Sequence, residues 1–166
     1  MSSGLATYTA IHVILSLAGI VSGLVVLSGF LSSRQPGGFT PVFLWTTLLT
    51  SLTGFGFPFT HVLPSHIVGA LSLGVLAIAI FARYGRRLAG GWRWAYVVSA
   101  MTALYFNCFV LVVQVFLKVP ALKSLAPTQS EPPFVVVQLV VLAAFVMLTI
   151  AAAVKFHPAQ QRRAAA

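Results

Sequence analysis

Histidine is the side chain of this 166-residue sequence best suited to chemistry, because other reactive groups are few. The sequence has one acid, Glu131, and one cysteine, Cys108, which excludes a paired-carboxylate mechanism and a disulfide framework. Two of the four histidines, His61 and His66, lie in one short stretch, residues 55–69. Imidazole is a common ligand of haem iron, copper and zinc, so these residues point to cofactor or metal ligation.

Prolines shape the stretch that carries these two histidines. Pro58 and Pro64 interrupt any helix that would cross it, because proline lacks a backbone donor and clashes with the preceding turn. Ser65 stands where a helix N-cap is expected, directly before a new apolar run. The stretch is therefore predicted to be a tight turn between two helices, with His66 at the start of the second.

The composition indicates that the elements on either side of this turn lie in a membrane. The chain is 59% hydrophobic and 7% charged, with a mean hydropathy of +1.00, whereas a soluble domain carries about 25% charged residues. Apolar runs long enough for the ~20 residues that a bilayer requires recur along the sequence. We expect an all-α polytopic bundle, one domain over residues 1–166, with about five transmembrane helices. The predicted spans are 8–31, 41–57, 66–84, 94–117 and 134–156, followed by a basic tail, 157–166.

The basic residues set the expected orientation. A net charge of +9 would be compatible with a nucleic-acid partner, but the charges lie in loops as the positive-inside rule predicts, so no such partner is expected. Only Lys118 and Lys123 fall on the other side, beside Glu131. We expect the N-terminus outside and the C-terminus inside a bacterial inner membrane. The residues assigned to the inner side are Arg34, Arg83, Arg86, Arg87, Arg93, Lys155, Arg162 and Arg163.

This orientation places three histidines at a similar depth near the outer side. His12 shares a helix face with Ser16, Gly19 and Gly23, at about 100° per residue. The two glycines form a G-x-x-x-G motif that permits close helix packing. His12 and His66 are the pair predicted to hold one haem b through its axial positions. Copper or zinc is the alternative, with His61, Glu131 or water completing the site.

A polar stripe runs along the predicted fourth span. Asn107, Gln114 and Lys118 recur at spacings of seven and four, which places them on one helix face. An unbonded amide in hydrocarbon is costly, so Asn107 and Gln114 must bond to protein or water. The stripe either joins helices or lines a hydrated path.

Two segments of the sequence resemble segments of known proteins. They are the first span, with His12 and its glycine face, and the third span, which opens with Ser65-His-Ile-Val-Gly69. They are similar to small bacterial multi-pass membrane proteins, both b-type cytochrome membrane subunits and uncharacterised histidine-glycine helix families. The resemblance implies a haem or metal site on the outer side that exchanges electrons with a quinone. The sequence departs from the two-haem cytochromes, which have histidines near both faces: only His157 lies near the inner face, so at most one haem is expected.

Three functions are therefore compatible with the sequence. The first is a haem- or metal-binding electron-transfer protein, alone or as a subunit of a respiratory-type assembly. The second is a small-solute or ion channel or transporter that uses the polar stripe. The third is a structural or assembly subunit with no cofactor, whose partners are other membrane subunits or further copies of itself. No catalytic residue is predicted, and whether the chain is an enzyme is left open.

Overall fold

The computed structural model describes residues 3–57 and 64–157, and over these ranges the chain is helical without strands. Within these ranges, four helical segments are long and apolar enough to cross a membrane: Ser3–Leu31, His66–Gly85, Trp92–Lys118 and Pro132–Lys155. These segments confirm the expected all-α class and are typical of an integral membrane protein. The fifth predicted span is the helix Phe39–Gly54, which has only 16 residues.

The elements follow the predicted spans closely. They are α1 (Ser3–Leu31), α2 (Phe39–Gly54), α3 (Pro64–Ile80), a π-helical turn η1 (Phe81–Gly85), α4 (Trp92–Lys118), α5 (Pro120–Leu125) and α6 (Pro132–Lys155). Because α3 begins at Pro64, Ser65 lies in its first turn and the N-cap prediction for Ser65 was wrong. Proline suits this position, since the first helical residues have no intrahelical acceptor for an N–H.

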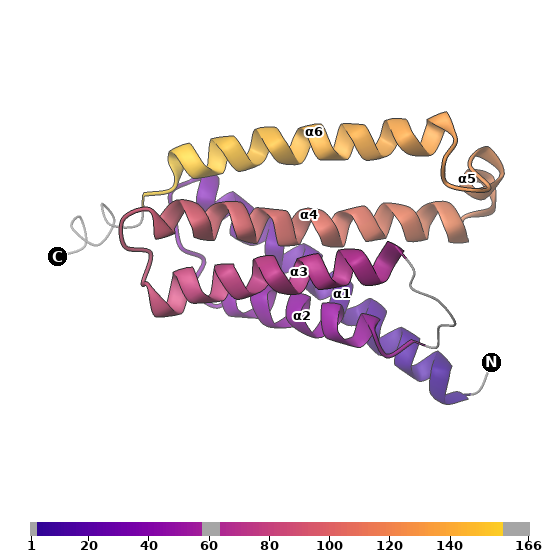
Figure 1. Ribbon diagram of the computed structural model, residues 1–166, viewed down its shortest axis with the longest axis horizontal. Helices are drawn as coiled ribbons and strands as arrows, with labels where there is room; N and C mark the ends of the chain where they lie inside the picture. Colours follow the sequence, from indigo (N-terminus) through magenta and orange to yellow (C-terminus); the bar gives the residue numbers. More distant parts are fainter. Residues whose placement is uncertain (1–2, 58–63, 158–166) are drawn as a thin grey trace.

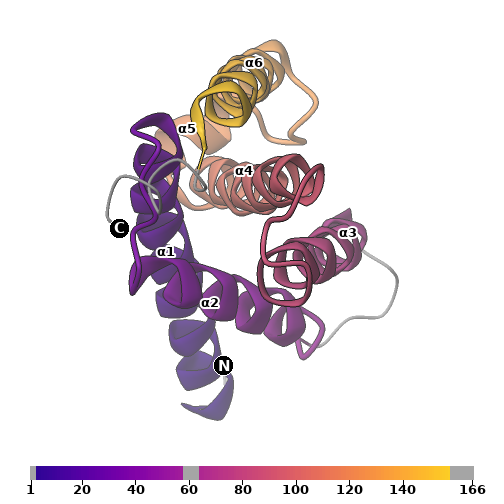
Figure 2. The ribbon, with the colours of Figure 1, turned by 90° about the vertical axis from the view of Figure 1, so that its left-hand side faces the viewer.

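The long helices run alternately up and down (Figure 1). Seen along the bundle, α4 lies in the middle, with α1 and α2 on one side and α3 and α6 around it (Figure 2). Contacts between the elements agree, because α4 packs against α1, α2, α3 and α6. The end of the bundle where α2 finishes and α3 begins also holds α5 and the start of α6 (Figure 1). We call it the histidine end, and the opposite end the arginine end.

Close packing is concentrated toward the arginine end. Phe30 lies edge-on to Tyr96, with ring centroids 5.5 Å apart, and 4.8 Å from Phe156. All three side chains are buried. The glycines of α1 permit the approach of neighbouring helices, since a Cβ at Gly23 would lie 2.9 Å from the ring of Phe43. The G-x-x-x-G face is thus used inside the bundle, against α2 and α4.

The segment between α4 and α6 packs against the bundle. It forms the short helix α5, and Ala126 is buried with Phe116 and Phe134 in a small second core. The side chain of Gln129 donates to the carbonyl of Val113 at 2.9 Å. The segment therefore packs on α4 and α6, away from α1 and α3 (Figure 1).

Candidate functional site

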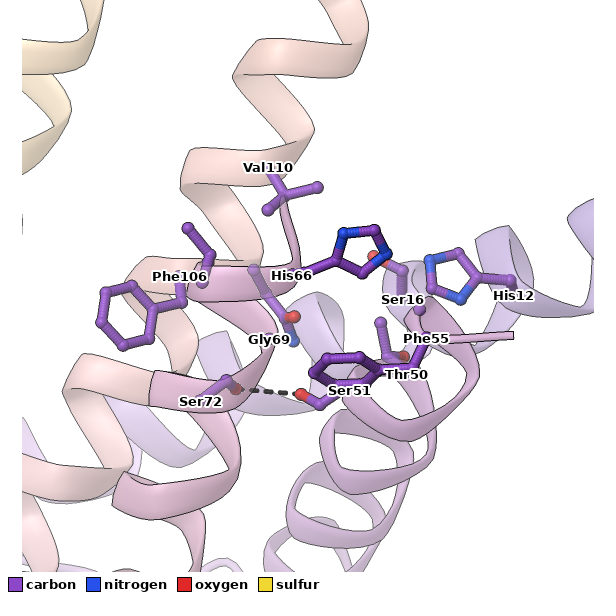
Figure 3. Close-up of a pocket in the computed structure, with 13 residues that line it drawn as sticks. His12, Ser16, Thr50, Ser51, Phe55, His66, Gly69, Ser72, Phe106 and Val110 are labelled. Atoms are coloured by element: carbon purple, nitrogen blue, oxygen red, sulfur yellow. Dashed lines mark hydrogen bonds between the residues drawn. The ribbon is translucent and has the colours of Figure 1, made fainter. Parts of the chain in front are cut away.

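A cavity with a mixed polar and apolar lining lies between α1, α2, α3 and α4 at the histidine end (Figure 3). Its volume for water-sized molecules is about 80 Å³, enough for a few waters. His12 and His66 both line it and point toward one another. The structure thus brings together the two residues that the sequence analysis favoured. The lining residues are His12, Ser16, Thr50, Ser51, Gly54, Phe55, His66, Val68, Gly69, Ser72, Phe106, Asn107 and Val110.

The ring of His12 is held in a defined orientation by the end of α2. Its Nδ1 lies 2.8 Å from the hydroxyl oxygen of Thr53, and this hydroxyl in turn donates to the carbonyl of Leu49 at 2.7 Å. Because the Thr53 proton is already engaged, Nδ1 of His12 must be the donor, and Nε2 carries the lone pair. The ring also lies edge-on to Phe57, with centroids 5.1 Å apart. His12 is therefore fixed in the tautomer that can ligate through Nε2.

Small residues at the end of α2 make this arrangement possible. Tyr8 donates its hydroxyl to the carbonyl of Thr53 at 2.6 Å, which joins α1 to the last turn of α2. A Cβ at Gly56 would lie 2.1 Å from the Tyr8 hydroxyl, so only glycine allows the tyrosine to approach. A Cβ at Gly54 would contact His12 at 3.9 Å. Gly56 is therefore the residue that permits the close approach of α1 to the end of α2.

His66 is placed by α3 and by an aromatic ring of α2. Its imidazole lies 5.7 Å from the ring of Phe55, tilted by 34°. Phe55 fits against α3 because residue 69 is glycine, where a Cβ would stand 3.2 Å from the phenyl edge. His66 is half-buried and lies in the first turns of α3, where its side chain lines the cavity.

Hydroxyl groups provide most of the remaining polar lining. Ser51 donates to Ser72 at 3.0 Å, which joins α2 to α3. The hydroxyl of Thr50 is buried and has no hydrogen-bond partner in the described part of the chain. A buried hydroxyl without a partner costs about 1–3 kcal/mol, so this atom favours a polar occupant of the cavity. The sequence analysis missed these residues, although the hydroxyls at positions 47, 50, 51 and 53 recur with helical spacing along one span.

One predicted ligand, Glu131, does not line the cavity, and a second cannot be placed relative to it. His61 lies outside the described residues. Glu131 lies near the start of α6, where its carboxylate accepts from the backbone N–H groups of Thr128 and Ser130, each at 3.1 Å, and from the Thr128 hydroxyl at 2.9 Å. Over residues 3–57 and 64–157, no cluster of three or more His, Cys, Asp or Glu residues could enclose a metal ion.

The polar stripe of α4 divides into two parts. Asn107 is buried, lines the cavity and donates to the hydroxyl of Thr47 at 3.2 Å. Gln114 and Lys118 are exposed on the bundle surface, where α4 extends toward its end. The stripe therefore gives one interhelical bond at the cavity and two surface groups near the end of the helix.

Comparison with protein-family models, with curated proteins and with solved structures gave no match to this chain.

Proposed function

We propose that this membrane protein binds one transition-metal ion between His12 and His66, with copper favoured over zinc, and serves electron transfer. The observation that carries the proposal is the fixed tautomer of His12, whose Nε2 faces the His66 ring across the cavity (Figure 3). Metal-binding histidines commonly donate their second ring N–H to an oxygen acceptor, which orients the ring. Thr53 is such an acceptor.

The charges around the cavity favour copper. Its lining contains no acid, and the only acid of the chain is engaged in the loop before α6. An ion that enters the cavity from water loses hydration energy, and here no carboxylate is nearby to compensate. This loss is smaller for a singly charged ion such as Cu(I). Among divalent first-row ions, Cu(II) also stands above Zn(II) in the affinity order for nitrogen ligands. The hydroxyls of Ser16 and Thr50 are available to bond a water or an anion beside the ion.

A haem is an alternative occupant that is larger than a metal ion, and the volume of the cavity disfavours it. The space admits a few water molecules, which is far less than a porphyrin ring needs. Haem binding would require α2 and α3 to separate at this end, with loss of the Phe55–Gly69 contact. The residue types fit the iron, but the volume favours a single ion.

The proposed orientation puts the histidine end outside. The exposed and half-buried cations Arg34, Arg83, Arg86, Arg87, Arg93 and Lys155 lie toward the opposite end, and the positive-inside rule would retain that end in the cytoplasm. A metal site on the outer side would exchange electrons with a quinone or with a partner subunit within the bilayer.

Metal and haem content of the purified protein test the proposal. The expected result is one copper per chain after equilibration with equal copper and zinc, no Soret band, and loss of the copper in His12→Phe and in His66→Phe. His157→Phe, at the other end of the bundle, is the matched control and should keep its copper. Equal copper in all four proteins, or a Soret band that persists in both cavity variants, would contradict the proposal.

A further inference from the structure

The arginine end carries a cluster of positive charge without a neighbouring acid. Its cations come from five different elements and links, and the only acid in the sequence, Glu131, lies at the histidine end. Charges of one sign at a membrane surface attract anions of the opposite sign. The groups differ in how far they are already engaged, and this difference identifies the residues that a ligand could reach.

Arg93 is already used to hold α6 in place. Its Nη1 donates to the carbonyls of Ala153, at 2.9 Å, and Phe156, and its guanidinium lies 4.6 Å from the ring centroid of Trp94. These carbonyls belong to the last turn of α6, where acceptors have no intrahelical partner. Arg93 is thus a structural residue and is not counted in the proposed site.

Arg83 lies inside the π-helical turn η1 and is only partly satisfied. Its guanidinium carbon is 5.6 Å from the centre of the Tyr84 ring and 5.5 Å from that of Tyr96. Its Nε is buried and has no acceptor among the residues described. A ring face stabilises the positive charge but takes up few of the five N–H donors of a guanidinium. Arg83 therefore retains the capacity to donate to an anionic oxygen.

Arg86 and Arg87 follow η1 in a connection whose backbone is fixed. The N–H of Arg86 donates to the carbonyl of Phe81 at 2.9 Å, and that of Leu88 to Ala82 at 3.0 Å. Arg87 and Leu88 have φ values of 50° and 60°, in the left-handed region that non-glycine residues adopt rarely. Because these backbone donors are engaged, an anion would bind to the side chains, and both residues are exposed. The Arg86 guanidinium lies 5.4 Å from the centre of the Trp92 ring, a contact that takes up few of its N–H donors.

An apolar helix face leads directly to these arginines. Ile67, Leu71, Ile78 and Phe81 lie on one side of α3, and each is about half exposed, from 48% to 57%. Gly74 lies on the same side, and a Cβ there would meet nothing within 4 Å. This face runs from the first turns of α3 to η1. It offers acyl chains a surface that ends at the cationic connection.

We propose that the connection between α3 and α4 binds the phosphate of an anionic phospholipid. Arg86 and Arg87 would contact the phosphate, with Arg83 beside them, and the acyl chains would lie along the exposed face of α3. Free phosphate has the same charge but cannot use the apolar face, so the combined surface fits a lipid better than a small anion. The site is independent of the metal cavity, which lies at the other end of the bundle.

Native mass spectrometry of the full-length protein in detergent tests this site. Palmitoyl-oleoyl phosphatidylglycerol should be retained, and its phosphatidylcholine counterpart should be lost. The double variant Arg86→Gln/Arg87→Gln should bind the anionic lipid about thirtyfold more weakly, from two charges near the surface. The double variant Lys118→Gln/Lys123→Gln removes the same charge at the histidine end and should bind it as the unmodified protein does.

Three results would overturn the proposal. They are equal weakening in both double variants, equal retention of phosphatidylcholine, and displacement of the lipid by millimolar inorganic phosphate. Arg86 and Arg87 are exposed, so their double variant should melt at the same temperature as the unmodified protein in lipid-free detergent. Arg83→Lys is a second measurement that keeps the charge, and it should weaken lipid binding less than Arg83→Gln does.

Discussion

Replacing Thr53 by valine should weaken metal binding without removing either histidine. Valine has nearly the shape of threonine but lacks the oxygen that accepts from Nδ1 of His12 at 2.8 Å. The imidazole would then be free to rotate or to change tautomer, and Nε2 would no longer be directed at the ion. Loss of such an acceptor typically reduces metal affinity about 10–100-fold, or about 1.4–2.8 kcal/mol.

The fold should change much less than the affinity. The Thr53 hydroxyl also bonds to the carbonyl of its own helix at Leu49, and a side-chain hydrogen bond between membrane helices contributes on average about 0.6 kcal/mol. Competition with a chromophoric Cu(I) chelator measures the affinity, and thermal unfolding measures stability. Thr149→Val is the matched control, because that hydroxyl bonds only to Phe145 of its own helix, α6.

The reasoning fails if Thr53→Val binds copper as tightly as Thr149→Val does. Unchanged affinity would mean that Thr53 does not position His12. An equal fall in copper affinity in Thr53→Val and Thr149→Val would assign the effect to general loosening of the bundle.

Further predictions concern packing, the stripe and the outer loop. Gly23→Ala should lower the melting temperature, because the ring of Phe43 would stand 2.9 Å from the new methyl and overpacking costs about 1–3 kcal/mol; Gly74→Ala, with open space, should raise it or leave it unchanged. Asn107→Leu should destabilise the protein by roughly 0.6 kcal/mol, because its interhelical hydrogen bond is lost. Gln114→Leu, on the surface, should change the stability by less than about 0.5 kcal/mol. Equal effects of the two substitutions would show that the stripe is not divided. Desolvation acts to raise the pKa of Glu131, but hydrogen bonds from Thr128 and Ser130 outweigh it and hold the pKa below its usual 4.5. The carboxylate therefore stabilises the loop fully above about pH 4.5 and loses this effect as the pH falls through the lowered pKa; hydrogen exchange of residues 126–134 should rise over that range, and Glu131→Gln should show no such step.

Hydrophobic runs predicted the long helices well because a bilayer requires continuous apolar segments. The glycine pair at positions 19 and 23 also predicted close packing, although the sequence did not show which helices it contacts. The structure adds the short helix α5, which follows a proline and has too few residues to show a period. It also adds the π turn at Phe81–Gly85, whose extra residue per turn leaves no composition signal.

The cavity was predictable only in part. Apolar runs fixed the depth of His12 and His66, so their meeting at one end followed from topology. The hydrogen bond from His12 to Thr53 did not, because it depends on how closely α1 approaches the end of α2. That approach is set by Tyr8 and Gly56, whose contact joins residues far apart in the chain.

X-ray absorption spectroscopy of the copper-loaded protein tests the central claim most directly. The account predicts that two imidazole nitrogens bind each copper ion, and that His66→Phe and His12→Phe each remove this pair. A spectrum without imidazole scattering, or one that is unchanged in both variants, would contradict it.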